Sequence, residues 1–118
     1  MIDTAMLHLI TDAGEGVLVL VDGLQPSELL RSRLTRGEVQ RQLQLMAGTL
    51  GALSPAAQAA LPEVDWAGWR GVSVALAMPT GQALDDALWF GASALVPATL
   101  LWLRVYRESQ PALFSYTT

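Results

Sequence analysis

Few side chains in this sequence could carry out nucleophilic or acid–base chemistry. The 118 residues contain one histidine, His8, and no cysteine. The lack of cysteine excludes disulfides, thiolate nucleophiles and cysteine-ligated metals. One imidazole cannot build a zinc site of several histidines, and any serine–histidine pair would have to use His8. We therefore expect no metal and no cofactor, and we interpret His8 as a histidine without a chemical role.

Two neighbouring carboxylates, Asp85 and Asp86, are the next candidates for chemistry. Paired carboxylates can bind Mg²⁺, but adjacent residues of a helix point about 100° apart. Acidic residues in a first turn also complement the positive end of the helix dipole. We interpret this pair as part of a helix N-terminus.

The charge balance limits the partners that the chain can have. All seven basic residues are arginines, and eleven acidic residues bring the formal net charge to −4. Counterion release from a basic surface supplies most of the non-specific affinity for nucleic acids. We therefore expect no DNA partner, and RNA is a doubtful one. The only basic cluster in the sequence comprises Arg31, Arg33, Arg36 and Arg41. We interpret it as a solvated, salt-bridged face, and alternatively as a surface for an acidic partner.

One apolar segment is almost long enough to span a membrane. Residues 87–103 carry no charge over 17 positions, which as a helix is about 26 Å against roughly 30 Å of hydrocarbon. Gly91, Ser93, Pro97 and Thr99 interrupt it, and no basic start precedes the first helix as in a signal peptide. We interpret the segment as a buried helix or helix pair at a core or subunit interface, and expect a cytoplasmic protein without a membrane partner.

The hydrophobic spacing predicts an all-α fold. We expect one domain over residues 1–118, an up-down bundle of five to six helices, with the last ten or so residues as a tail. The predicted helices cover about 2–21, 26–34, 35–53, 55–61, 65–78 and 82–107. Pro97 should kink the last helix or start a new first turn. Residues 16–21, GVLVLV, could alternatively form a buried strand if taken alone.

Local signals predict where the helices begin and which faces are buried. Ser27 is the expected cap of the second helix, and Thr35 with Glu38 forms a predicted capping box for the third. Ser54 and Asp65 are expected N-caps of the next two helices. The predicted core face of the third helix consists of Val39, Leu43, Met46, Leu50 and Leu53.

A series of short motifs follows in a fixed order over residues 2–107. They are Leu34-Thr35-Arg36, Leu53-Ser54-Pro55, Pro62-Glu63, Trp66 with Gly71 five residues later, Trp89 and Val96-Pro97. In this order and spacing they resemble the HepT-like group of HEPN-domain proteins. These are all-α toxins encoded beside small MNT-type nucleotidyltransferase antitoxins. The resemblance implies a HEPN-like helical bundle that works as a homodimer with such a nucleotidyltransferase as partner.

The family's activity is metal-independent cleavage of RNA. Its signature is an arginine followed a few residues later by a histidine, commonly Arg-Asn-Arg-x-x-His with a tyrosine two residues on. Cleavage through the RNA 2′-hydroxyl needs a group that moves protons near neutral pH, which the histidine supplies. It also needs a fixed cation against the scissile phosphate, which suits the planar guanidinium.

This sequence departs from the signature at every position. The family's spacing places its first arginine at Ser73, the polar residue after it at Val74 and its histidine at Met78. The tyrosine to which partners of active members attach AMP falls at Thr80, whose hydroxyl is a candidate modification site. Arg70 lies three residues before Ser73, and no histidine follows anywhere in the chain. The resemblance therefore implies a HepT-like fold whose ribonuclease site is dismantled.

Three hypotheses about function follow from these observations. The first is an inactive HepT-like binding or regulatory module, with Arg70 and Trp69 as candidate binding residues and the uncharged stripe of the last two helices as a subunit contact. The second is an active ribonuclease with a relocated site, for instance Arg70 with His8. The third is a small membrane-associated protein that uses residues 87–103. The four tryptophans, which we interpret as packing anchors, are Trp66, Trp69, Trp89 and Trp102.

Overall fold

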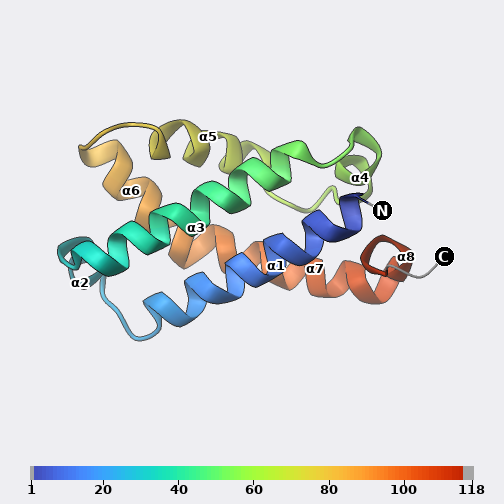
Figure 1. The fold of residues 1–118 in the computed structure, drawn as a ribbon, viewed down its shortest axis with the longest axis horizontal. Helices are drawn as coiled ribbons and strands as arrows, with labels where there is room; N and C mark the ends of the chain where they lie inside the picture. Colours follow the sequence, from blue (N-terminus) through green and yellow to red (C-terminus); the bar gives the residue numbers. More distant parts are fainter. Residues whose placement is uncertain (1, 116–118) are drawn as a thin grey trace.

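The computed structural model describes residues 2–115, and over this range it is helical without any strand (Figure 1). Because α6, η1 and α7 form one continuous 28-residue helix, the described residues contain seven helices, slightly more than the five to six expected. The elements are α1 (Ile2–Val21), α2 (Pro26–Arg31), α3 (Arg33–Ala52), α4 (Pro55–Ala60), α5 (Trp66–Leu76), α6 (Gln82–Phe90), the π-helical turn η1 (Gly91–Leu95), α7 (Val96–Ser109) and α8 (Pro111–Phe114).

The bundle is elongated, with extents of 46 × 26 × 20 Å. Helices α1 and α3 lie side by side in opposite directions, and α7 runs along the other side of α1 (Figure 1). Helix α5 packs against α3 and α6, while α8 packs against α1 and α7. The described chain therefore begins and ends at the same end of the bundle, beside α4 (Figure 1).

The core is one cluster of buried apolar side chains to which all the long helices contribute. Helix α1 places Leu7, Ile10 and Val17 in it, and the whole of residues 16–21 is helical, so the alternative of a strand there is wrong. The face of α3 predicted from the hydrophobic spacing is confirmed. The buried residues of this face are Val39, Leu43, Met46 and Leu50, and Leu53, which directly follows α3, is buried as well.

Two of the predicted helix caps are confirmed. Ser54 accepts a hydrogen bond from the Ala57 N–H at the start of α4, and Asp65 accepts one from the Gly68 N–H at the start of α5. Ser54 also donates from its own N–H and hydroxyl to the carboxylate of Asp3, at 2.9 and 2.6 Å. The same serine therefore caps α4 and ties it to the first turn of α1.

Two other predicted caps are wrong. Ser27 lies inside α2, whose N-cap is Gln25 in a reciprocal capping box with Glu28. Thr35 lies in the first turn of α3, and its N–H donates to the hydroxyl of the true cap, Ser32. The observed caps lie two and three residues before the predicted ones, because another polar residue precedes each of them.

The π-helical turn η1 explains how the last long helix accommodates Pro97. Proline lacks the backbone donor and crowds the preceding turn of an α-helix. The wider turn Gly91–Leu95 ends directly before α7, and Pro97 lies in the first turn of α7. The helix therefore continues past Pro97 through a π-helical turn and does not start again there. A Cβ at Gly91 would lie 3.0 Å from Leu43 Cδ1, so a glycine here allows η1 to approach α3.

The predicted tail after Ser109 is more ordered than expected. Residues 111–114 form α8, which buries Phe114 against the bundle. The hydroxyl of Thr4 donates to the Leu113 carbonyl at 2.9 Å, which fastens α8 to the start of α1. The remainder of the predicted tail, residues 116–118, lies outside the described residues.

Two helices among the described residues are long and apolar enough to cross a membrane by length and composition. They are Ile2–Val21 and Gln82–Ser109, and 33% and 44% of their most apolar windows are buried inside the protein. The helix that contains residues 87–103 packs its Leu88, Leu95, Val96 and Leu103 into the core. Core helices of globular proteins pass the same test of length and composition.

Candidate functional site

The residues that the resemblance assigns to the motif lie along α5 and the loop that follows it. Ser73 and Val74 are exposed on α5, and 64% of Val74 is accessible to solvent. Met78 and Thr80 belong to the exposed loop 77–81 between α5 and α6, where 46% of Met78 is accessible. The described residues therefore leave Met78 uncovered, and the hydroxyl of Thr80 lies at the surface.

A hollow of about 260 Å³ brings Arg70 and Ser73 together on one side of α5. Val74 and Met78 do not line this hollow. Trp69, the other candidate binding residue, also lines it, but sequence reasoning missed the part of the wall that α3 and α4 supply, because these helices carry no chemical motif there. The lining residues are Ala47, Leu50 and Gly51, Gln58 of α4, and Trp66, Trp69, Arg70 and Ser73.

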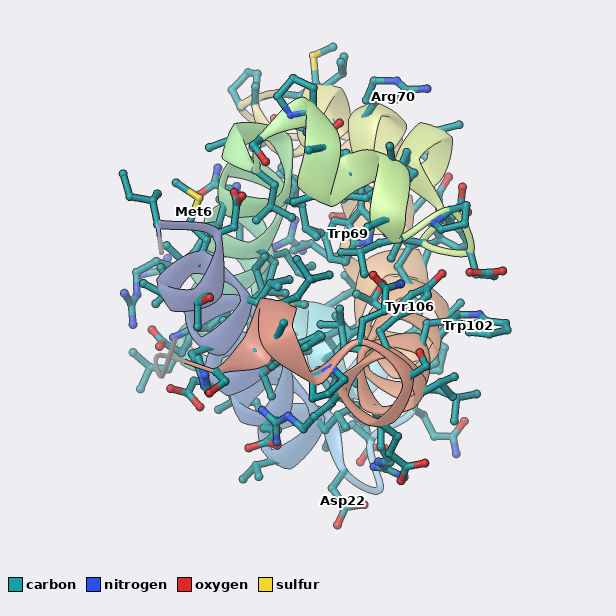
Figure 2. All side chains as sticks on the ribbon, turned by 90° about the vertical axis from the view of Figure 1, so that its right-hand side faces the viewer. Met6, Asp22, Trp69, Arg70, Trp102 and Tyr106 are labelled. Atoms are coloured by element: carbon teal, nitrogen blue, oxygen red, sulfur yellow. The ribbon has the colours of Figure 1, made fainter. Side chains whose placement is uncertain are left out.

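The two candidate binding residues on α5 point in opposite directions (Figure 2). Arg70 extends away from the bundle, and its side chain is exposed. Trp69 points inward and is buried, and its indole N–H donates to the hydroxyl of Thr99 on α7 at 2.9 Å. Trp69 is therefore a packing anchor between α5 and α7, which leaves Arg70 as the exposed member of the pair.

The single histidine does not share a site with Arg70. His8 lies on α1, where its Nε2 is 2.9 Å from the carbonyl oxygen of Phe114 in α8. Helix α1 packs against α3, α7, α8 and η1, and α5 packs against α3, α6 and η1. The structure thus places the imidazole beside the chain's end and the guanidinium on the outer face of α5.

Two of the four arginines in the basic cluster on α2 and α3 form ion pairs within the protein. Arg36 forms an ion pair with Asp85 of α6, and Arg41 forms one with Glu38. Hydrogen bonds from Arg41, and then from Gln42, lower the pKa of Glu38 to about 2, and the carboxylate of Glu38 raises the pKa of Arg41. The predicted salt-bridged face is therefore present at these two arginines.

Asp85 and Asp86 each bond to a neighbouring side chain and are not arranged as the ligands of one metal ion. Asp85 is held by Arg36, and Asp86 accepts a hydrogen bond from Gln82 at 2.6 Å within the first turn of α6. Within residues 2–115, no group of three or more histidine, cysteine, aspartate or glutamate side chains could hold a metal ion.

Comparisons with protein-family models, with curated proteins and with solved structures found no match to this chain. The assignment of a function therefore depends on the residues and geometry of the chain itself.

Proposed function

We propose that this protein is a HepT-like helical protein without ribonuclease activity, which acts in the cytoplasm as a dimeric binding or regulatory module. Its proposed partner is an MNT-type nucleotidyltransferase. The main observation behind the proposal is the type of residue found at the motif positions. Ser73 and Met78 stand where the family has its arginine and histidine, and the sole histidine of the chain contacts Phe114 on a different helix.

The chemistry of this surface supports the absence of RNA cleavage. A thioether and an aliphatic side chain, at Met78 and Val74, cannot move protons near neutral pH. Ser73 has no histidine beside it to act as a base, so its hydroxyl is not activated for nucleophilic attack. Arg70 alone can contact a phosphate, but it cannot accept the proton of a 2′-hydroxyl.

An exposed apolar stripe along the long helix supports a subunit contact. It runs from Phe90 to Val105, about 22 Å along the axis, and 45% of Phe90, 54% of Leu101 and 43% of Val105 are exposed. Small residues, Ala94 and Ala98, are exposed between them. A second copy placed antiparallel would pair the bulky ends and let the small residues at the centre approach closely, in a self-complementary twofold contact.

The activity is tested by incubating the purified protein with total RNA. We expect no specific cleavage from the unmodified protein, at any concentration at which it is dimeric. The double variant Ser73→Arg, Met78→His restores the residue types of the motif at exposed positions, so it should fold like the parent. Specific cleavage by the unmodified protein that is lost in Arg70→Ala or His8→Ala would contradict the proposal and favour a relocated active site.

The partner is tested by co-expression with the neighbouring open reading frame. A short nucleotidyltransferase with a Gly-Ser pair followed by paired aspartates should co-purify with this protein. Intact-mass measurement with and without ATP shows whether AMP is added, and Thr80→Val identifies the position. Absence of any complex with such a neighbour contradicts the partnership.

The dimer is tested by analytical ultracentrifugation of the soluble fraction. A charge in the stripe, Leu101→Glu, should convert dimer to monomer, while Val19→Glu, an equally drastic change at an exposed residue of α1, should not. Recovery of the protein only from membranes, or an unchanged monomer in both variants, contradicts this part of the proposal.

A further inference from the structure

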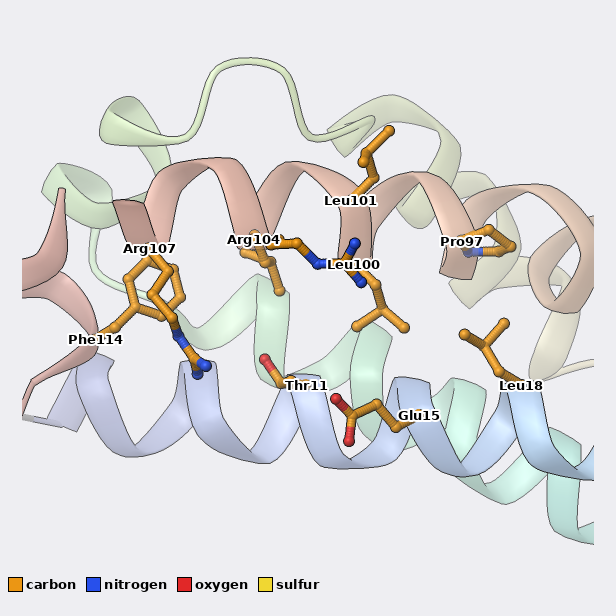
Figure 3. Close-up of a pocket in the computed structure, with 10 residues that line it drawn as sticks. Thr11, Glu15, Leu18, Pro97, Leu100, Leu101, Arg104, Arg107 and Phe114 are labelled. Atoms are coloured by element: carbon orange, nitrogen blue, oxygen red, sulfur yellow. The ribbon is translucent and has the colours of Figure 1, made fainter. Parts of the chain in front are cut away.

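A surface trough lies between α1 and α7 and is closed at one end by α8 (Figure 3). Its volume is about 430 Å³, within the range of sites that bind small molecules. Figure 3 shows Arg107 and Glu15 reaching into the space between the two helices, with Leu18 and Pro97 at the opposite end from Phe114. The trough does not overlap the α5 hollow that contains Arg70.

Two arginines of α7 line the trough, Arg107 at the Phe114 end and Arg104 with its guanidinium beside Leu100 (Figure 3). Neither forms an ion pair with a carboxylate among the described residues, whose two ion pairs are Arg36–Asp85 and Arg41–Glu38. In a chain with a net charge of −4, two of the seven arginines therefore line one trough without an ion pair to a carboxylate among the described residues, and Glu15 lies on the facing wall. Such guanidinium groups can bind a carboxylate or a phosphate by charge-assisted hydrogen bonds.

Arg107 is also held in place. The guanidinium of Arg107 lies 5.6 Å from the centroid of the Phe114 ring, within the distance of a cation–π contact. Phe114 is itself buried, and the bond from Thr4 to Leu113 fixes its helix on α1. Because the protein orders the arginine beforehand, little side-chain entropy is lost when an anion binds there.

The other end of the trough is apolar. Leu18, Pro97, Leu100 and Leu101 line it, and Pro97 lies about 15 Å along the helix axis from Arg107. Burying a hydrocarbon chain along these residues is favourable in proportion to the apolar area that leaves water. Glu15 lies on the same wall as Leu18 and would repel an anion placed beside it.

We propose that the trough binds an amphipathic anion. Its acidic head group would contact Arg104 and Arg107, and its single apolar chain would lie along Leu100 towards Leu18. This site uses none of the motif positions, and Leu101 at its rim also belongs to the proposed dimer stripe. The ligand is an acid with an aliphatic tail. Both a free carboxylic acid and an alkyl phosphate meet this description.

The experiment is calorimetric titration of the purified full chain with decanoate and with decyl phosphate, each below its micelle concentration. We expect saturable binding with one ligand per chain, and the tighter of the two identifies the head group. Decanol, which keeps the tail without the charge, and hexanoate, which keeps the charge with a shorter tail, should each bind at least tenfold more weakly. Equal affinity for decanol, or no saturable binding of either acid, overturns the proposal.

Three variants and one control localise the site. Arg104→Gln and Arg107→Gln should each weaken binding about tenfold, because each removes a charge-assisted contact. Glu15→Gln should tighten binding roughly threefold, because it removes a like charge. Arg33→Gln removes an exposed arginine of α3 outside the trough and should leave the affinity unchanged. If Arg33→Gln and Arg107→Gln weaken binding equally, the affinity comes from the overall charge of the protein, and the proposal is wrong. Binding only to anionic vesicles would also overturn it.

Discussion

The indole N–H of Trp69 donates to the hydroxyl of Thr99 at 2.9 Å, and both side chains are buried. This bond joins α5, which carries the motif positions, to α7, which lines the trough. A buried donor without its acceptor costs about 1–3 kcal/mol, more than the net contribution of the bond itself. The pair therefore helps to hold α5 against α7, in addition to the packing of α5 on α3, α6 and η1.

Thr99→Val should lower the free energy of unfolding by about 1–3 kcal/mol, because it leaves the Trp69 N–H buried without a partner. Trp69→Phe should cost more, since it also removes side-chain volume from the core. The double variant should cost less than the two single changes together, because neither polar group is left alone. Urea denaturation of all four proteins measures these differences, and strictly additive costs would contradict the coupling.

The contact between Asp3 and Ser54 makes stability depend on pH. The hydroxyl and then the N–H of Ser54 hold the pKa of Asp3 below its ordinary value of 3.8. A carboxylate with a lowered pKa in the folded state stabilises the fold above its unfolded pKa, and this contribution is lost as the pH falls through the folded value. Asp3→Asn should therefore be less stable than the parent at pH 7.

The difference between the parent and Asp3→Asn should shrink as the pH falls below about 4. Denaturation midpoints at a series of pH values measure it. Asp12→Asn, which removes an exposed carboxylate from the same helix, controls for the change in net charge. A difference that is constant down to pH 2 would show that Asp3 contributes through its shape and not through its charge.

Two glycines of α1 should respond oppositely to substitution. A Cβ at Gly14 would lie 2.9 Å from Leu100 Cδ2 and 3.1 Å from Met46 Cε, whereas a Cβ at Gly16 meets nothing within 4 Å. Gly14→Val should destabilise the protein by about 1–3 kcal/mol through overpacking. Gly16→Ala should stabilise it by up to about 1 kcal/mol through helix propensity. Thermal unfolding compares them, and equal effects would show that α1 and α7 are not in close contact at Gly14.

The ion pair between Arg36 and Asp85 links the start of α3 to α6. Both side chains are partly exposed, at 25% and 30%, so we expect a coupling energy of only about 0.5–1 kcal/mol. A double-mutant cycle with Arg36→Gln and Asp85→Asn measures it. The coupling should decrease at high salt, because exposed charges are screened, and a coupling that is insensitive to salt would contradict an exposed pair.

Features that depend on neighbouring residues could be predicted from the sequence. Ser54 and Asp65 cap their helices because the bond from a cap reaches only to the third residue beyond it. The buried face of α3 follows from the recurrence of apolar residues every three or four positions. The same local rule could not choose between Ser32 and Thr35, since both are hydroxyl residues three positions apart with a helix after them.

Features that depend on contacts between remote segments could not be predicted. Whether a tryptophan is a binding platform or a packing anchor depends on what faces it, and Thr99 faces Trp69 from thirty positions further along the chain. The helix α8 forms because Phe114 finds a buried position beside α1, and a four-residue segment has no strong signal of its own.

The sequence by itself determined which residue types are available: with one histidine and no cysteine, no folding of the chain can bring together two imidazoles or supply a thiolate. It also determined most of the longer helices, because their periodicity is local, but not α8 or two of the helix caps. Only the tertiary structure decided that Arg104 and Arg107 share a trough with Glu15 and Leu18. These residues lie on helices far apart in the chain, and the packing of the whole core sets how those helices meet.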